Sequence, residues 1–206
     1  IPSTHGIVVS ALPTGGLSIL RNNFQIGENE IGVNVTSNIS TSLIIGSTGN
    51  ANTFALNDAT AKGINLANNQ ITGTLTIDAN NFGGTSAGTG IYISSTNSTG
   101  SSNGTVNITA NTFSTNVGDA IVFEDAVNAA NSLSGATINI YNINDFSQSG
   151  YGIKINDVGT YTGFIGNTLP NTIDLYDTGS NTNFTAADIY GGAWYDLTGT
   201  SALLYP

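Results

Sequence analysis

Few residues of this chain are of types that do chemistry, and most of those are carboxylates. Asp and Glu number 13 in 206 residues, against 3 Lys and Arg, 1 His and no Cys. Carboxylate oxygens are preferred Ca²⁺ ligands, and two carboxyl groups about 5 to 9.5 Å apart can hydrolyse a glycosidic bond. We therefore interpret the acidic segment as a candidate Ca²⁺ site or carboxylate pair, with solvated turn residues as the simpler alternative. Its members are Asp119, Glu124, Asp125 and Asp145, the Ca²⁺ candidates, and Asp157.

The remaining polar residues do not form a familiar catalytic set. His5 is the only histidine, so it cannot build a zinc site alone. Arg21 is the only Arg, and we expect it to pair with Glu28 or Glu30, which follow in the next turn. The chain contains no Gly-x-x-x-x-Gly-Lys phosphate motif. We expect no catalytic residue, no enzyme activity and no cofactor besides Ca²⁺.

Composition narrows the class of protein and its partners. The formal net charge of -10 argues against nucleic acid, because phosphate binding needs clustered Lys and Arg. No apolar run approaches the roughly 20 residues of a spanning helix, so we expect no membrane insertion. A chain that starts at Ile1 and has no Cys, few Lys and many Asn and Thr favours a secreted, extracellular or cell-surface protein.

A repeat organises the chain. Six copies of the tripeptide Asn-x-Phe or Asn-x-Leu recur at about the length of one coil, with their Asn residues 30, 28, 31, 33 and 23 positions apart. Short alternating segments flank each copy, such as Leu75-Thr76-Ile77 before the third and Gly90-Ile91-Tyr92-Ile93 after it. The Asn residues are Asn22, Asn52, Asn80, Asn111, Asn144 and Asn167, and their apolar partners are Phe24, Phe54, Phe82, Phe113, Phe146 and Leu169.

Alternation with a period of two predicts strands with one apolar face. Strands this short cannot bury that face alone, whereas stacked coils make continuous apolar columns. We predict an all-β, single-domain, right-handed parallel β-helix of about six coils, with coils in 1–175 and an aromatic-rich cap or assembly segment in 176–206. We expect the Phe residues to stack at one corner and the Asn amides to bond from coil to coil in a turn, where Asn tolerates left-handed geometry. An antiparallel sandwich also has short strands but does not explain the recurring tripeptide.

Asn-x-Phe followed by Gly-Ile-x-Ile at this spacing resembles the right-handed parallel β-helix repeat family. That family includes pectate lyases, phage tailspikes and many bacterial or archaeal surface proteins. The resemblance covers about Gly6 to Leu175 and implies the fold, which hosts many activities. A lyase site of that family would need clustered carboxylates for Ca²⁺ and a nearby Arg base. No Asp cluster lies beside Arg21, so the catalytic pattern is not matched.

The two ends suggest two alternatives. Gly6-Ile7-Val8-Val9 matches the second strand of a coil whose first part is missing, which would leave an open strand edge. Either the ends cap their own coils, or they complete each other between subunits, and a head-to-tail contact that does not close makes a filament. The candidate assembly residues are Ile7, Val9, Tyr190, Trp194, Tyr195 and Tyr205.

Our hypothesis is a non-enzymatic extracellular structural protein that builds a filament, sheath or surface layer by head-to-tail stacking. Its partners would be copies of itself, with surface glycans as a second candidate through adhesion. The alternative is a carbohydrate-binding or polysaccharide-degrading β-helix, an adhesin or depolymerase domain that uses the acidic segment. An ice-binding face is a third interpretation, which would need regular rows of Thr. The Thr residues concerned are Thr72, Thr74, Thr76, Thr105 and Thr109.

Overall fold

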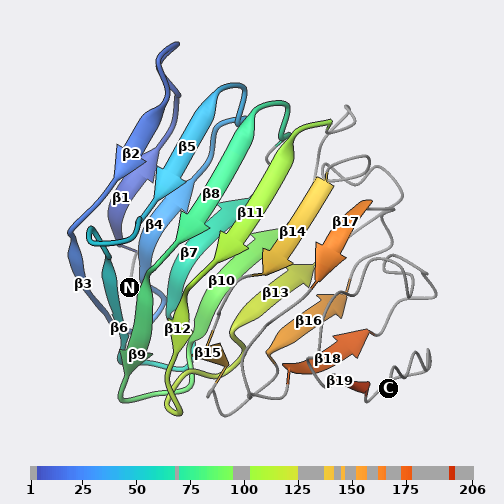
Figure 1. Cartoon of the computed structure of the whole chain (residues 1–206). Helices are drawn as coiled ribbons and strands as arrows, with labels where there is room; N and C mark the ends of the chain where they lie inside the picture. Colours follow the sequence, from blue (N-terminus) through green and yellow to red (C-terminus); the bar gives the residue numbers. More distant parts are fainter. Residues whose placement is uncertain are drawn as a thin grey trace.

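A computed structural model describes residues 4–67, 70–94, 103–124, 137–141, 145–146, 152–156, 162–165, 173–177 and 195–197 (Figure 1). In this part of the chain the regular elements are all β-strands, and they form three parallel sheets. The predicted all-β, right-handed parallel solenoid is therefore confirmed, with about four turns described in detail. None of these residues belongs to a helix that could cross a membrane.

Each turn of the solenoid visits the second sheet, then the third, then the first. The first sheet contains β1 (His5–Val9), β4 (Ile31–Val35), β7 (Lys62–Ala67), β10 (Thr89–Ser94), β13 (Ile121–Glu124), β16 (Ile153–Asn156), β18 (Ile173–Asp177) and β19 (Tyr195–Leu197). The second sheet contains β2 (Leu17–Ile19), β5 (Ser42–Ile45), β8 (Thr74–Asp78), β11 (Thr105–Thr109), β14 (Thr137–Tyr141) and β17 (Thr162–Ile165). The third contains β3 (Asn23–Ile26), β6 (Thr53–Leu56), β9 (Asn81–Gly84), β12 (Thr112–Phe113) and β15 (Asp145–Phe146).

The core consists of columns of equivalent apolar residues. In the second sheet Leu17, Leu43, Leu75 and Val106 are register partners, and Leu43 and Leu75 are 0% exposed. Because full burial of such a side chain contributes about 1.5 to 3 kcal/mol, the columns hold strands together that would be too short to persist alone.

The turn that precedes the recurring Asn contains a left-handed residue in three of the coils. Arg21, Ala79 and Ala110 have φ of 61°, 55° and 52°, and each lies directly before a repeat Asn. The turn before Asn52 is longer and uses two glycines with positive φ, Gly46 and Gly49. The repeat Asn itself does not adopt the left-handed geometry that we expected of it: the residue before it does, and the Asn lies directly before the next strand.

Candidate assembly site at the first coil

The recurring Asn residues form a hydrogen-bonded ladder. Asn52 Oδ1 accepts from N and Nδ2 of Asn22 at 2.9 and 3.0 Å, and Asn52 Nδ2 donates to Asn80 Oδ1 at 2.9 Å and to the Ile19 carbonyl at 2.8 Å. Asn80 repeats the arrangement with Asn111 Oδ1, at 3.0 Å from both of its nitrogens. An amide has two donors and two acceptor sites, so every one of them is used at Asn52. This satisfies polar groups that are 0% exposed.

The ladder has a direction along the solenoid axis. In the bonds between one ladder Asn and the next, each side chain donates to the Oδ1 of the Asn in the following coil and accepts from the Asn in the preceding coil. Asn22, the first member, donates to Asn52, but among the described residues no donor reaches its Oδ1. The N-terminal end of the ladder is therefore an acceptor end.

The Phe residues form a second column beside the ladder. Rings of Phe24, Phe54, Phe82 and Phe113 stack with centroids 4.8 Å apart and planes within 12° of parallel. Phe54 is 0% exposed, whereas Phe24, the first ring, is 8% exposed. The column therefore ends at the first coil with one ring face uncovered by another ring.

Glycines of the first sheet make room for these rings, a role that the sequence analysis missed. A Cβ added to Gly32 would lie 2.8 Å from the Phe54 ring, and one added to Gly6 would lie 2.7 Å from the Phe24 ring. Gly63 and Gly90 face Phe82 and Phe113 in the same way. The signal was present, since Gly opens the strand that follows most copies of the tripeptide.

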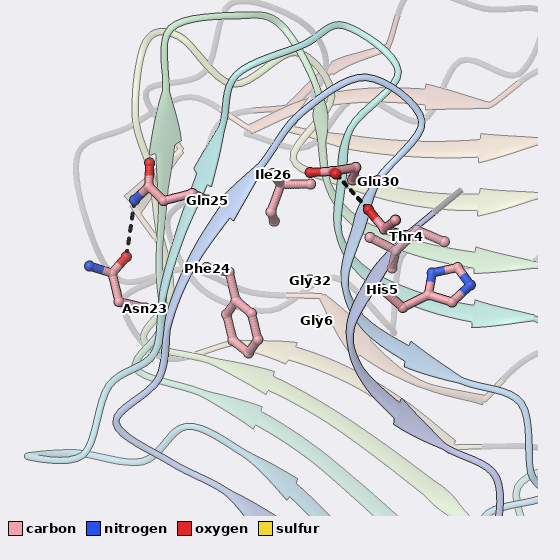
Figure 2. Close-up of a pocket in the computed structure, with 10 residues that line it drawn as sticks. Thr4, His5, Gly6, Asn23, Phe24, Gln25, Ile26, Glu30 and Gly32 are labelled. Carbon is pink, nitrogen blue, oxygen red and sulfur yellow. Dashed lines mark hydrogen bonds between the residues drawn. The ribbon is translucent and has the colours of Figure 1, made fainter. Parts of the chain in front are cut away.

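A hollow of about 290 Å³ lies at the open end of these columns, between β3 and β1 (Figure 2). Phe24 and Ile26 supply its apolar part, and Gly6 and Gly32 leave space where other residues would place side chains. In the later coils the place that corresponds to this hollow is filled, because each strand of the third sheet lies beside the third-sheet strand of the preceding coil. The full lining is Thr4, His5, Gly6, Asn23, Phe24, Gln25, Ile26, Glu30, Ile31 and Gly32.

Polar contacts on the rim fix β1 to the first coil. Thr4 Oγ1 donates to Glu30 Oε1 at 2.5 Å (Figure 2). The Gly27 N–H donates to Glu30 Oε2 at 2.7 Å. The Thr4 hydroxyl first, and then the Gly27 amide, hold the pKa of Glu30 below its ordinary value. His5 Nε2 lies 3.3 Å from Asn34 Nδ2, on the side of β1 next to β4.

Arg21 does not take the partner that we expected. Its Nε donates to Asn50 Oδ1 at 2.6 Å, in the longer turn of the next coil. Glu30 is instead engaged by Thr4 and Gly27, so the expected ion pair between Arg21 and Glu30 is wrong. The extra residues of the second turn bring Asn50 within reach, which no local sequence rule foresees.

Among the described residues, β1, β2 and β3 are the terminal strands of their sheets at this end, so each has one outer edge without a strand partner there. In β3, the carbonyls of Asn22 and Ile26 accept from Thr53 and Asn57 of the next coil. Backbone groups of a strand alternate in direction, so the N–H and C=O of Asn23 and Gln25 point to the outer edge. On β2 the N–H and C=O of Ser18 point to the outer edge in the same way, because the carbonyl of the neighbouring Ile19 accepts from the Gly46 N–H of the next coil.

The predicted assembly residues are distributed unevenly. Ile7 and Val9 lie on β1, and their side chains pack into the core, with Val9 only 3% exposed. The outer edge of β1 is thus formed by backbone N–H and C=O groups, and the side chains of Ile7 and Val9 do not contribute to it. Tyr195 lies on β19, the terminal strand of the first sheet at the other end. Tyr190, Trp194 and Tyr205 lie outside the described residues.

The Ca²⁺ candidates are mostly beyond what the structure describes. Among the described residues no group of three or more His, Cys, Asp or Glu could hold a metal ion. Asp119 is described, Glu124 and Asp145 are placed by their strands β13 and β15, and Asp125 and Asp157 lie outside. In the repeat, Asn144, Asn167 and Leu169 also lie outside, and Phe146 is placed only by β15. The Ca²⁺ site stays a prediction.

The Thr residues form one regular row. Thr74, Thr105, Thr137 and Thr162 are register partners, with Ser42 at the start. The next outward row is mixed, and Thr109 is buried with its hydroxyl on Asp78 at 2.6 Å. The second sheet therefore does not form the several regular rows of Thr that an ice-binding face would need. The members of the mixed row are Ser18, Ile44, Thr76, Asn107 and Asn139.

The fold defines a class, a right-handed parallel β-solenoid. No protein family model, no curated protein and no solved structure matches the chain. Inference about its role therefore depends on the geometry of the chain itself.

Proposed function

We propose that this protein is an extracellular structural subunit that assembles head to tail, coil upon coil, into a filament, sheath or surface layer. The observation that carries the proposal is the surface of the first coil. Its strand edges, the Asn22 acceptor and the Phe24 ring repeat the surface that every inner coil presents to the coil before it. A preceding coil of the same kind therefore complements this end.

Two of these edge strands, β2 and β3, carry neither of two common protections against association, a charged residue or a Pro. Proteins that avoid edge pairing place charged residues, Pro or bulges on their edge strands. The sequences of β2 and β3 are Leu-Ser-Ile and Asn-Phe-Gln-Ile, without a charge or a Pro. Such an edge is a template for pairing with another strand, which supports a role in assembly.

The same reasoning favours surface and filament members of the β-helix repeat proteins over their polysaccharide-cleaving members. The chain has a net charge of -10 and a polar surface built from Asn, Ser and Thr, as suits a protein exposed outside the cell. Uncharged amides and hydroxyls also suit contact with surface glycans, so adhesion is a second part of the proposal. No catalytic step is assigned.

Electron microscopy and sedimentation of the purified chain over a wide concentration range test the proposal. We expect elongated particles that lengthen with concentration, and a meridional reflection near 4.8 Å from oriented filaments, since strands stack along the axis. Particles that remain monomeric at every concentration would refute head-to-tail assembly.

A further inference from the structure

We infer that β1 and β4 are joined on the outward face of the first sheet by a pH-sensitive contact, which neutral His5 makes with Asn34 and protonated His5 cannot make. Asn65 Nδ2 donates to Asn34 Oδ1 at 2.8 Å, and Asn34 Nδ2 lies 3.3 Å from His5 Nε2. The three side chains form a row across β1, β4 and β7 that ends at an imidazole. The row lies between β1 and the coils that follow it, so it does not depend on what precedes β1 or on head-to-tail assembly.

The two amides of this row occupy the same place in consecutive coils. Asn34 and Asn65 are register partners, and in β4 the core residues Val33 and Val35 flank Asn34. Because successive residues of a strand point to opposite faces, the amides lie on the outward face of the sheet. They are nevertheless only 8% and 7% exposed. Their polar atoms therefore depend on partners within the protein.

The bond between the two amides decides which group faces His5. The oxygen and the nitrogen are the two arms of a side-chain amide, and only the nitrogen arm donates. Since Asn34 Oδ1 accepts from Asn65 Nδ2, the NH₂ group of Asn34 is the arm directed at His5 Nε2. A ring nitrogen that accepts a hydrogen bond carries no proton. The arrangement therefore requires neutral His5 with its proton on Nδ1.

A positive charge lies at the other end of the row. Tyr92 is the register partner of Asn65 in β10, and Lys62 Nζ lies 3.5 Å from the centroid of the Tyr92 ring. With Asn65 Nδ2 bonded to Asn34, the Oδ1 of Asn65 is the arm on the side of β10. A cation attracts the oxygen of an amide and repels its NH₂ group. Lys62 thus stabilises the orientation in which the NH₂ group of Asn34 faces His5.

Protonation of His5 breaks the row at this link. An imidazolium has donors on both ring nitrogens and no acceptor, so it meets the NH₂ group of Asn34 donor to donor. The bond would be restored only if Asn34 and Asn65 both reversed, which would turn the NH₂ group of Asn65 toward the Lys62 ammonium. Because Lys62 opposes this reversal, the protonated ring separates from Asn34, and β1 loses a side-chain contact with β4.

The strands that contact β1 add no competing charge. β4 and β3 carry no titratable side chain. In the turn before β4, Glu28 is exposed, and Glu30 accepts from Thr4 and Gly27, which holds the pKa of Glu30 below its ordinary value. Imidazoles change charge between about pH 5 and pH 8, a range in which Glu30 stays a carboxylate. Glu30 therefore does not contribute to a change in that range.

NMR of the ¹⁵N-labelled chain, in solution or in the solid state, tests the contact. At about pH 8 we expect the ring of His5 to carry its proton on Nδ1, with a cross-peak between the ring and the NH₂ group of Asn34. As the pH falls to about 5, this cross-peak should vanish and the Asn34 amide resonances should shift together with the ring. A proton on Nε2 at the higher pH would overturn the inference. So would an Asn34 amide that stays unchanged while His5 becomes charged.

Two variants and an internal control complete the test. In His5→Gln an amide oxygen can accept from Asn34 at every pH, so the Asn34 resonances should no longer respond. In Lys62→Met the opposing charge is gone, so the cross-peak between His5 and Asn34 should persist at low pH. The NH₂ group of Asn139, bonded to Asn107 Oδ1 at 3.0 Å without a histidine, should not respond in any of these proteins. An unchanged pH response of Asn34 in His5→Gln would overturn the inference, and loss of the cross-peak in Lys62→Met as in the wild type would overturn the part assigned to Lys62.

Discussion

At the residue scale, the buried amides of the ladder are the most demanding groups of the molecule. Asn52, Asn80 and Asn111 are 0% exposed, and each spans two coils with its side chain. A buried amide is tolerated only when its donors and acceptors are all used. Hydrophobic residues of similar size would fill the space, but they would remove the amide donor that a carbonyl of the preceding coil receives and the amide partners on either side in the ladder.

Replacement of one ladder amide should therefore be costly. In Asn80→Ala the N–H and Nδ2 of Asn52 lose their acceptor and the Ile45 carbonyl loses its donor. Each orphaned buried group costs roughly 1 to 3 kcal/mol, so we expect the free energy of unfolding to fall by about 3 to 5 kcal/mol, as measured by urea denaturation.

Two further substitutions control that measurement. Asn57→Ala removes an exposed amide and should change stability by less than about 0.5 kcal/mol. Asn80→Asp keeps the shape, replaces donors by a buried negative charge and should be at least as damaging as Asn80→Ala. If Asn80→Ala unfolded at the urea midpoint of Asn57→Ala, the ladder would have no energetic role.

Glu30 should make the attachment of β1 depend on pH. Its pKa is below the ordinary 4.5 because the carboxylate accepts from Thr4 and Gly27. A lowered pKa in the folded state means that the contribution is present above the unfolded-state pKa and is lost as the pH falls through the folded-state pKa. We expect the wild type to melt above Glu30→Gln at neutral pH and the two melting temperatures to converge as the pH falls through the lowered folded-state pKa of Glu30. A gap that persists at low pH would mean that charge is not the cause.

At the scale of the element, the turns decide where each strand begins. The turn from Ile45 to Asn52 contains two glycines of nearly equal φ, 76° at Gly46 and 79° at Gly49. Both positions strain any other residue in the same way. They differ in their surroundings, because a Cβ on Gly46 would collide with the Asp78 carbonyl and with Asn80 Oδ1, whereas nothing lies within 4 Å at Gly49.

The pair Gly46→Ala and Gly49→Ala separates backbone strain from collision. Gly49→Ala should cost about 1 to 2 kcal/mol, the strain of a left-handed Ala. Gly46→Ala carries that strain and also displaces the ladder amide of Asn80, so we expect at least about 2 kcal/mol more, by chemical denaturation. Equal costs at both positions would show that the ladder gives way without penalty.

The elements also show how far sequence reasoning reaches. The Asn and Phe columns were predictable, because the residue types that form them recur at coil length and require like neighbours. The left-handed residues were not, since neither the Arg at position 21 nor the Ala at positions 79 and 110 is a residue type that favours this φ. The bond from Arg21 to Asn50 and the outward groups of Asn23 and Gln25 depend on register between coils, which no single segment encodes.

At the scale of the whole molecule, the solenoid is nearly one-dimensional, so each coil is stabilised by its two neighbours. The first coil has a neighbour on one side only among the described residues, with β1, β2 and β3 as terminal strands. Its hydrogen bonds and ring stack therefore contribute less to stability than those of the coils around Phe54 and Phe82, which are covered on both sides. Whatever covers the first coil stabilises the entire chain.

This gives a prediction about the melting temperature of the wild-type chain. A partner that binds the folded state stabilises it by mass action, by about 1.4 kcal/mol for each tenfold rise in concentration above the dissociation constant. For a chain of 206 residues, we expect the melting temperature to rise by about 3 to 5 °C per tenfold increase in protein concentration. Gln25→Pro should show a smaller rise, because it removes an outward N–H of β3 and leaves the edges of β1 and β2 unchanged, while Gln25→Ala should follow the wild type. A wild-type melting temperature independent of concentration, from nanomolar to millimolar, would mean that a second copy does not cover the first coil.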